Sequence, residues 1–143
     1  MERKEKIAFI FPAAQDANGN EGPVLHYQCD EIPIDTKVMV AAAFVCLNQS
    51  KKYLISLNII DKYGKTILKG SPDKLPAKTT IIADDGAAEP DDVPGFLRAD
   101  LQVRITNIGV HTIQVSIASD DEPSKVFHEM EARFRVILKG ENK

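Results

Sequence analysis

Carboxylates gather in one stretch, ADDGAAEPDDVPG at residues 83–95, which holds five acidic side chains and no basic one. A second acidic stretch, SDDEP, follows at residues 119–123. Calcium takes roughly six to eight oxygen ligands, often from carboxylates on neighbouring loops. Two such loops at one end of a domain could therefore hold a calcium ion. The ligand candidates are Asp84, Asp85, Asp91, Asp92, Asp120 and Asp121.

Two other interpretations of the acidic stretch stay open. It could be an acidic surface that docks another protein, or a solvated connection rich in turn-forming residues. The sequence contains no D-x-D-x-D run, and the segment DANGNEG at residues 16–22 breaks the EF-hand pattern, because Glu21 stands where that loop needs glycine.

Residues suited to catalysis are scarce, and no enzyme activity or cofactor is expected. The sequence has no G-x-S-x-G, P-loop, G-x-G-x-x-G, H-E-x-x-H or C-x-x-C motif. If residues 119–124 form a hairpin loop, His128 lies opposite Val115 and away from His111, so the two histidines cannot share a zinc ion. Carbohydrate binding is also disfavoured: tryptophan is absent, and the strand aromatics mostly follow core parity, with Phe127 as the exception.

Bulk composition predicts a soluble, cytoplasmic protein of one domain spanning residues 1–143. The net charge of −3 and the lack of a basic run argue against nucleic-acid binding. The longest uncharged apolar run, residues 38–47, is about half of the roughly 20 residues that a membrane-spanning helix needs, so no membrane association is expected. Residues 1–15 are interpreted as a first strand and not as a signal peptide. Cys29 and Cys46 are expected to be small buried side chains without a disulfide.

Period-2 alternation dominates the elements that must position these residues, and it predicts an all-β fold of about eight strands. The expected strands cover residues 6–12, 23–29, 37–47, 52–60, 65–69, 77–83, 96–105, 110–117 and 125–138. The last three alternate most cleanly, with one apolar and one polar face each. This is typical of an antiparallel sheet that buries one face, and the number of strands favours an antiparallel β-sandwich.

The segment GVHTIQVSIASDDEPSKVFHEMEARFRVIL, residues 109–138, resembles the closing hairpin of bacterial immunoglobulin-like sandwiches. The small size and the NGN turn at residues 18–20 are similar to uncharacterised bacterial β-sandwich families. The resemblance implies an immunoglobulin-like fold and no particular activity. The Cys…Trp…Cys pattern of antibody domains is missing.

The expected third strand does not alternate, which leaves an apolar face to be covered. Its core-facing residues are expected to be Val38, Val40, Ala42, Phe44 and Cys46. The opposite face then carries Met39, Ala41, Ala43, Val45 and Leu47. Either a loop such as residues 69–76 covers this second face, or a second subunit does, because an exposed apolar patch marks an interface. The first functional hypothesis is therefore a non-catalytic protein-interaction module, with a protein partner or a second copy bound at these residues.

The second hypothesis is a calcium- or small-ligand-binding sandwich that uses an acidic pole. If the strands alternate up and down, the connections at residues 30–35, 61–64, 83–95 and 119–123 fall at one end. That end would hold 12 of the 21 acidic residues: Asp30, Glu31, Asp35, Asp61, Asp84, Asp85, Glu89, Asp91, Asp92, Asp120, Asp121 and Glu122. The two connections 83–95 and 119–123 are expected to be neighbours whatever the remaining topology, because the last three strands pair antiparallel.

Overall fold

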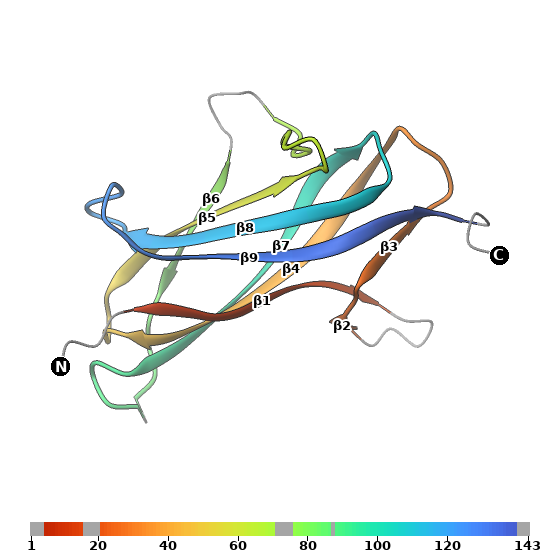
Figure 1. Ribbon diagram of the computed structural model, residues 1–143. Helices are drawn as coiled ribbons and strands as arrows, with labels where there is room; N and C mark the ends of the chain where they lie inside the picture. Colours follow the sequence, from red (N-terminus) through yellow and green to blue (C-terminus); the bar gives the residue numbers. More distant parts are fainter. Residues whose placement is uncertain (1–4, 16–20, 71–75, 87, 140–143) are drawn as a thin grey trace.

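A computed structural model describes residues 5–15, 21–70, 76–86 and 88–139 of the protein. Within these residues nine strands form two sheets and no helix is present (Figure 1). The strands are β1 (Lys6–Gln15), β2 (Glu21–Pro23), β3 (His26–Cys29), β4 (Ile34–Leu47), β5 (Lys52–Ile60), β6 (Ala77–Ile82), β7 (Val93–Ile105), β8 (Gly109–Ser119) and β9 (Val126–Leu138). In the described part of the chain no helix is long and apolar enough to cross a membrane.

One sheet has the strand order β2-β1-β4-β7 and the other the order β3-β9-β8-β5-β6. All pairs are antiparallel except β3 and β9, which run parallel. The two sheets lie face to face, and a shared apolar core fills the space between them. The prediction of an antiparallel β-sandwich is therefore confirmed, with nine strands in place of about eight.

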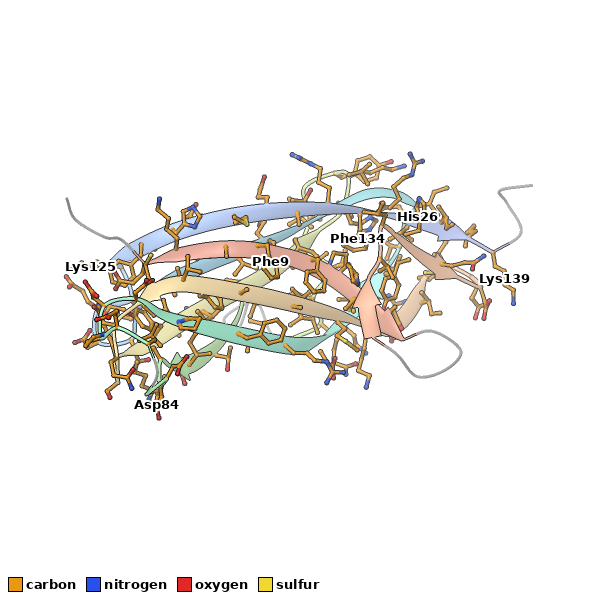
Figure 2. All side chains as sticks on the ribbon, turned by 90° about the horizontal axis from the view of Figure 1, so that it is seen from below. Phe9, His26, Asp84, Lys125, Phe134 and Lys139 are labelled. Atoms are coloured by element: carbon orange, nitrogen blue, oxygen red, sulfur yellow. The ribbon has the colours of Figure 1, made fainter. Side chains whose placement is uncertain are left out.

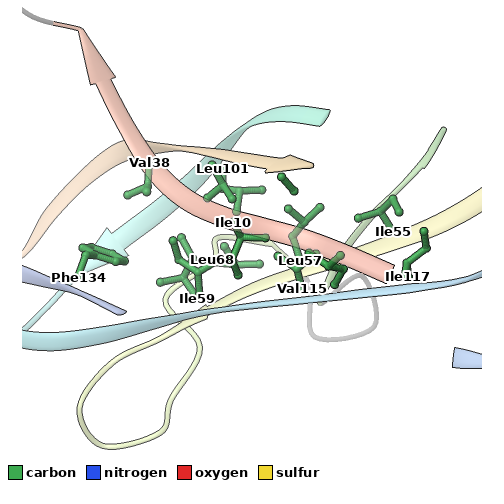
Figure 3. Close-up of a cluster of buried hydrophobic side chains, with 14 of the residues drawn as sticks. Ile10, Val38, Ile55, Leu57, Ile59, Leu68, Leu101, Val115, Ile117 and Phe134 are labelled. Atoms are coloured by element: carbon green, nitrogen blue, oxygen red, sulfur yellow. The ribbon is translucent and has the colours of Figure 1, made fainter. Parts of the chain in front are cut away.

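Alternating side chains of both sheets build the core (Figure 3). From the five-stranded sheet, Ile55, Leu57 and Ile59 of β5 point inward and are at most 2% exposed. From the four-stranded sheet, Val38 and Val40 of β4 meet them and are at most 1% exposed. Burying each such aliphatic side chain stabilises the fold by about 1.5–3 kcal/mol. This shared burial fixes which face of each strand is left outside.

The edges of the two sheets are joined on one side of the sandwich. The backbone N–H of Ile7 in β1 donates a hydrogen bond of 2.9 Å to Nδ1 of His128 in β9. His128 pairs with Ile117, and His111 pairs with Phe134. The predicted pairing of His128 with Val115 is wrong by two residues. The hairpin closes with Ala118 opposite Val126, one residue later than expected, and a register shift between Ile117 and Ala118 adds the second. The conclusion that the histidines lie apart is unaffected.

Two predicted strands differ from the structure. The segment expected as one strand at residues 23–29 is divided between β2, which pairs with β1, and β3, which crosses to the other sheet and pairs with β9. The segment expected at residues 65–69 makes only isolated bridges, Ile60 with Thr66 and Leu68 with Val103. Cys29 is buried as predicted, but Cys46 is only half-buried, so the prediction of a buried side chain is wrong there.

Candidate protein-interaction surface

The outer face of the four-stranded sheet carries a row of exposed apolar side chains. In the register of β1, β4 and β7, Ala43 pairs with Phe9 on one side and with Phe96 on the other. Phe9 is 50% exposed and Phe96 is 62% exposed, so no described segment covers this row. The next row places Ala41 between Phe11 and Arg98. The outward apolar residues of these three strands are called the apolar face below: Phe9, Phe11, Met39, Ala41, Ala43, Val45 and Phe96.

Most of the residues predicted for this face lie on it. Val45 is 38% exposed, and Met39 and Ala43 are half-buried. Ala41 lies on the same side but is 4% exposed, because it is small and stands between two large neighbours. Met39 Sδ lies 3.1 Å from Nε of Arg98, whose side chain therefore lies along the edge of the face. The predicted covering loop at residues 69–76 lies in part outside the described residues.

The prediction is wrong for Leu47, which is fully buried in the core. The pairing of β4 with β7 shifts between Phe44 and Leu47, and Cys46 adopts a φ of 61°. This bulge inserts one residue and reverses the alternation, so Leu47 turns inward and Cys46 does not. Gly95 makes the inward position fit, because a Cβ there would lie 2.8 Å from Cδ1 of Leu47.

Aromatic side chains on this face are the feature that the sequence did not reveal. Phe9 and Phe11 stack with ring centroids 5.9 Å apart. The expectation that strand aromatics follow core parity is wrong for Phe9, Phe11 and Phe96. The opposite error was made for Phe127, which was expected to face away from the core. It packs edge-on against Tyr53, with ring centroids 6.0 Å apart. Arg98 and Asp100 follow Phe96 at every second position of β7, and these polar residues indicated that Phe96 faces outward.

The acidic pole is assembled only in part. The connections at residues 83–92 and 119–125 do lie at the same end, and Figure 2 shows Asp84 and Lys125 there with His26 and Lys139 at the opposite end. The expected reason is wrong, because β7 and β8 belong to different sheets and do not pair. The connections at residues 30–35 and 61–64 lie at that opposite end, so this part of the prediction is wrong (Figure 1). The cause is the segment at residues 65–69, which was expected to be a strand but makes only isolated bridges. One strand, β6, and not two, therefore lies between the 61–64 turn and the 83–92 connection, which puts them at opposite ends.

Lysines and amides of the β4–β5 turn occupy the acidic end. Gln49 donates from Nε2 to Oδ1 of Asp84 at 2.7 Å and accepts from the backbone N–H of Asp85 at 3.2 Å. Lys52 Nζ lies 3.8 Å from Oδ2 of Asp120. The carboxylate of Asp121 accepts a short hydrogen bond from the Ser119 hydroxyl, which holds the pKa of Asp121 below its ordinary value.

These contacts do not favour calcium. Asp84, Asp85, Asp91 and Asp92 lie on the β6–β7 connection, and Asp120 and Asp121 lie on the β8–β9 connection. No group of three or more His, Cys, Asp or Glu side chains suited to a metal ion exists among the residues that the structure describes. The calcium hypothesis thus stays a prediction without geometric support.

A buried polar cluster pins the start of β1 at this end. Glu5 is 7% exposed, and its Oε2 accepts from the Tyr53 hydroxyl at 3.1 Å and lies 3.4 Å from Nζ of Lys51. The Tyr53 oxygen in turn accepts from the backbone N–H of Asn48 at 2.9 Å. Burial, the largest cause, raises the pKa of Tyr53 to about 12, and the charge of Glu5 acts in the same direction. Glu5 shares the inward parity of Ile7, which was the available signal for its burial.

A second buried cluster holds the turn after β5. Asp61 is 6% exposed, and its Oδ1 accepts from the backbone N–H groups of Tyr63 at 2.9 Å and Lys65 at 3.1 Å. Its Oδ2 accepts from Nδ2 of Asn107 at 3.0 Å, which ties the β7–β8 connection to the same turn. His111 is fully buried, and its Nδ1 lies 3.0 Å from the carbonyl oxygen of Gly109.

We expect Asp61→Asn to lower the free energy of unfolding at neutral pH by about 1–3 kcal/mol. Burial alone raises the pKa of Asp61, but the hydrogen bonds from Asn107, Lys65 and Tyr63 outweigh it and lower the pKa below its ordinary value of 3.8. A carboxyl whose pKa is lower in the folded state stabilises the fold above its ordinary pKa, and this contribution is lost as the pH falls through the folded value.

Urea unfolding of the wild type and of Asp61→Asn, at neutral pH and at a pH below the ordinary aspartate pKa, measures this loss of stability. The difference in the free energy of unfolding should narrow in acid, because the wild-type carboxyl is then protonated and uncharged, like the amide of the variant. An equal gap at both pH values would contradict an ionised role for Asp61.

No protein-family model and no curated protein matches the chain. Among solved structures, a bacterial adhesin from Mobiluncus mulieris that contains intramolecular disulfide, isopeptide and ester bond cross-links matches with a TM-score of 0.55 at 8% identity. The match covers 94% of this chain and 58% of the adhesin chain, so this chain spans less than two thirds of that structure's length. At this identity the likeness shows the β-sandwich fold alone.

Two further structures match at lower scores. A structural-genomics target has a TM-score of 0.37 at 10% identity, covering 100% of this chain and 93% of that one. A family 123 glycoside hydrolase from Clostridium perfringens has a TM-score of 0.33 at 11% identity, covering 81% of this chain and 23% of the hydrolase. Neither score supports an inference about activity.

Proposed function

We propose that this protein is a non-catalytic protein-interaction module that binds a second copy of itself through the apolar face. The observation that carries the proposal is the row of Phe9, Ala43 and Phe96, in which two half-exposed aromatic rings flank a small central residue. Contiguous exposed apolar surface of this kind marks an interaction site. The adhesin match supports the proposal only at the level of the β-sandwich fold.

A second copy fits this face better than an unlike partner for two reasons. The centre of the face is flat, since alanines at positions 41 and 43 fill the middle strand, and two flat sheets can stack on one another at about 10 Å. A surface that pairs with its own copy must also carry both signs of charge at its rim. Arg98 and Asp100 provide them, as successive outward residues of β7.

Sedimentation equilibrium across the micromolar range tests the proposal on the unmodified protein. We expect the mass to rise from monomer to dimer with concentration, and to do so in high salt as well, because apolar burial dominates the contact. A constant monomer mass up to high micromolar concentration would defeat self-association.

A further inference from the structure

An open pocket of about 620 Å³ lies on the five-stranded sheet at the end opposite the acidic loops. Three basic side chains from three separate elements line it: His26 of β3, Lys62 of the turn after β5, and Arg135 of β9. Backbone and apolar atoms of Ile108, Gly109 and Ile137 complete the wall. Figure 2 shows His26 at this end, far from Asp84. The pocket is thus separate from the apolar face, which belongs to the other sheet.

The strand pairing brings the basic groups together. The parallel register of β3 and β9 sets His26 beside Arg135. Gly109 has a φ of 111°, and a Cβ at this position would lie 3.3 Å from Cδ of Lys62. The Lys62 stem therefore lies over the glycine, and its ammonium group reaches the pocket that Arg135 lines from the neighbouring strand.

No carboxylate lines the pocket, and within the described residues no ion pair or side-chain hydrogen bond joins its three basic groups to an acidic side chain. Asp61, next to Lys62 in the chain, is buried, and its oxygens already accept three hydrogen bonds. Lys139 at the same end lies 3.9 Å from Asp30. Cationic groups gathered without a counter-charge repel one another, and a bound anion removes that repulsion.

The walls of the pocket are held in place before any ligand arrives. Asp61 fixes the turn that carries Lys62, and Asn107 ties that turn to the β7–β8 connection. His111 is fully buried, and its Nδ1 lies 3.0 Å from the carbonyl oxygen of Gly109. This contact fixes the part of the wall that Gly109 forms. A site whose supports are fixed in this way loses little entropy on binding.

We infer that this pocket binds a small organic phosphate. Arginine contacts phosphate oxygens through a planar pair of N–H donors, while lysine and histidine add single donors from other directions. Three donors converging from three elements suit a tetrahedral, multiply charged group better than a single planar carboxylate. Ile108 and Ile137 offer an apolar wall for the organic part of the ligand.

Calorimetric titration with inorganic phosphate and with phenyl phosphate tests the inference on the full chain at low salt. We expect both to bind in the millimolar range and phenyl phosphate to bind several-fold more tightly, because its ring reaches the apolar wall. Arg135→Gln and Lys62→Gln should each weaken binding about tenfold, which corresponds to about 1.4 kcal/mol. Thermal melts of each variant check that the fold is retained.

Arg133→Gln is the matched control. Arg133 lies two residues before Arg135 on the same face of β9, outside the pocket, with its guanidinium 3.9 Å from Glu131. We expect this change to leave the affinity within about twofold. No heat of binding from either probe, or an equal loss in Arg133→Gln and Arg135→Gln, overturns the site. Equal affinities for the two probes would overturn an organic phosphate as its ligand.

Discussion

Replacing Ala43 with arginine should keep the protein monomeric at concentrations where the proposed dimer forms. Ala43 stands between Phe9 and Phe96 at the centre of the apolar face. When two such faces stack, a guanidinium at this position must leave water without a carboxylate to pair with, and its bulk holds the sheets apart. We expect the dissociation constant to rise on the order of 100-fold, which corresponds to about 2.7 kcal/mol.

Sedimentation equilibrium measures the effect, and Ser116→Arg is its control. Ser116 lies at the centre of the other sheet's outer face, paired with Ser56 on one side and Glu129 on the other. The two variants add the same charge to similar strand positions on opposite sides of the sandwich. If both weaken association equally, or neither does, the interface is not on the four-stranded sheet.

The three last strands could be predicted from the sequence because alternation runs through most of their length. Along most of β7, β8 and β9 every second side chain is apolar and faces the opposite sheet, where it is buried or half-buried, and the other side is mostly polar. A one-residue slip would expose the whole apolar set, so the pattern determines which face turns inward. A two-residue slip keeps the faces unchanged, and the predicted pairing of β8 with β9 was wrong by two residues. The 83–95 and 119–123 connections share an end because successive strands run in opposite directions, although β7 and β8 lie in different sheets and do not pair.

The topology of residues 21–29 could not be predicted. β2 and β3 are three and four residues long, and a short apolar run does not indicate which sheet it joins. The separation of residues 61–64 from the acidic loops has another cause: residues 65–69 form no strand, so only β6 lies between that turn and the 83–92 connection. The bulge at Cys46 could not be predicted either, because cysteine seldom adopts a positive φ such as the 61° found there.

The candidate surface could be predicted only in part, for a related reason. The missing alternation of β4 indicated one strand of the apolar face, because a strand that is apolar on both sides presents a second apolar face besides the one in the core. The aromatic rings of Phe9, Phe11 and Phe96 come from flanking strands, and their contribution depends on the pairing order β1-β4-β7. The basic pocket depends still more on topology, since parallel pairing sets His26 beside Arg135 across more than a hundred residues of sequence.

Tyr53→Ala should be among the most destabilising substitutions in the chain, lowering the free energy of unfolding by about 3–5 kcal/mol. Tyr53 is fully buried, its ring packs edge-on against Phe127, and the ammonium of Lys51 lies 5.4 Å from the ring centroid. Removing the ring leaves a cavity beside a buried carboxylate. Chemical unfolding followed by circular dichroism measures the loss, and Tyr63→Ala is the control, because Tyr63 is 71% exposed in a turn.

Tyr53→Phe separates the hydroxyl from the ring. The hydroxyl donates to Glu5 and accepts from the Asn48 N–H, so phenylalanine leaves a buried carboxylate and a backbone donor each short of one partner. We expect a loss of about 1–3 kcal/mol, against a change within about 0.5 kcal/mol for Tyr63→Phe. A Tyr53→Phe variant as stable as Tyr63→Phe would mean that the ring alone holds this end of the sandwich together. The start of β1 would then depend on apolar packing and on the Lys51–Glu5 pair, without help from the tyrosine oxygen.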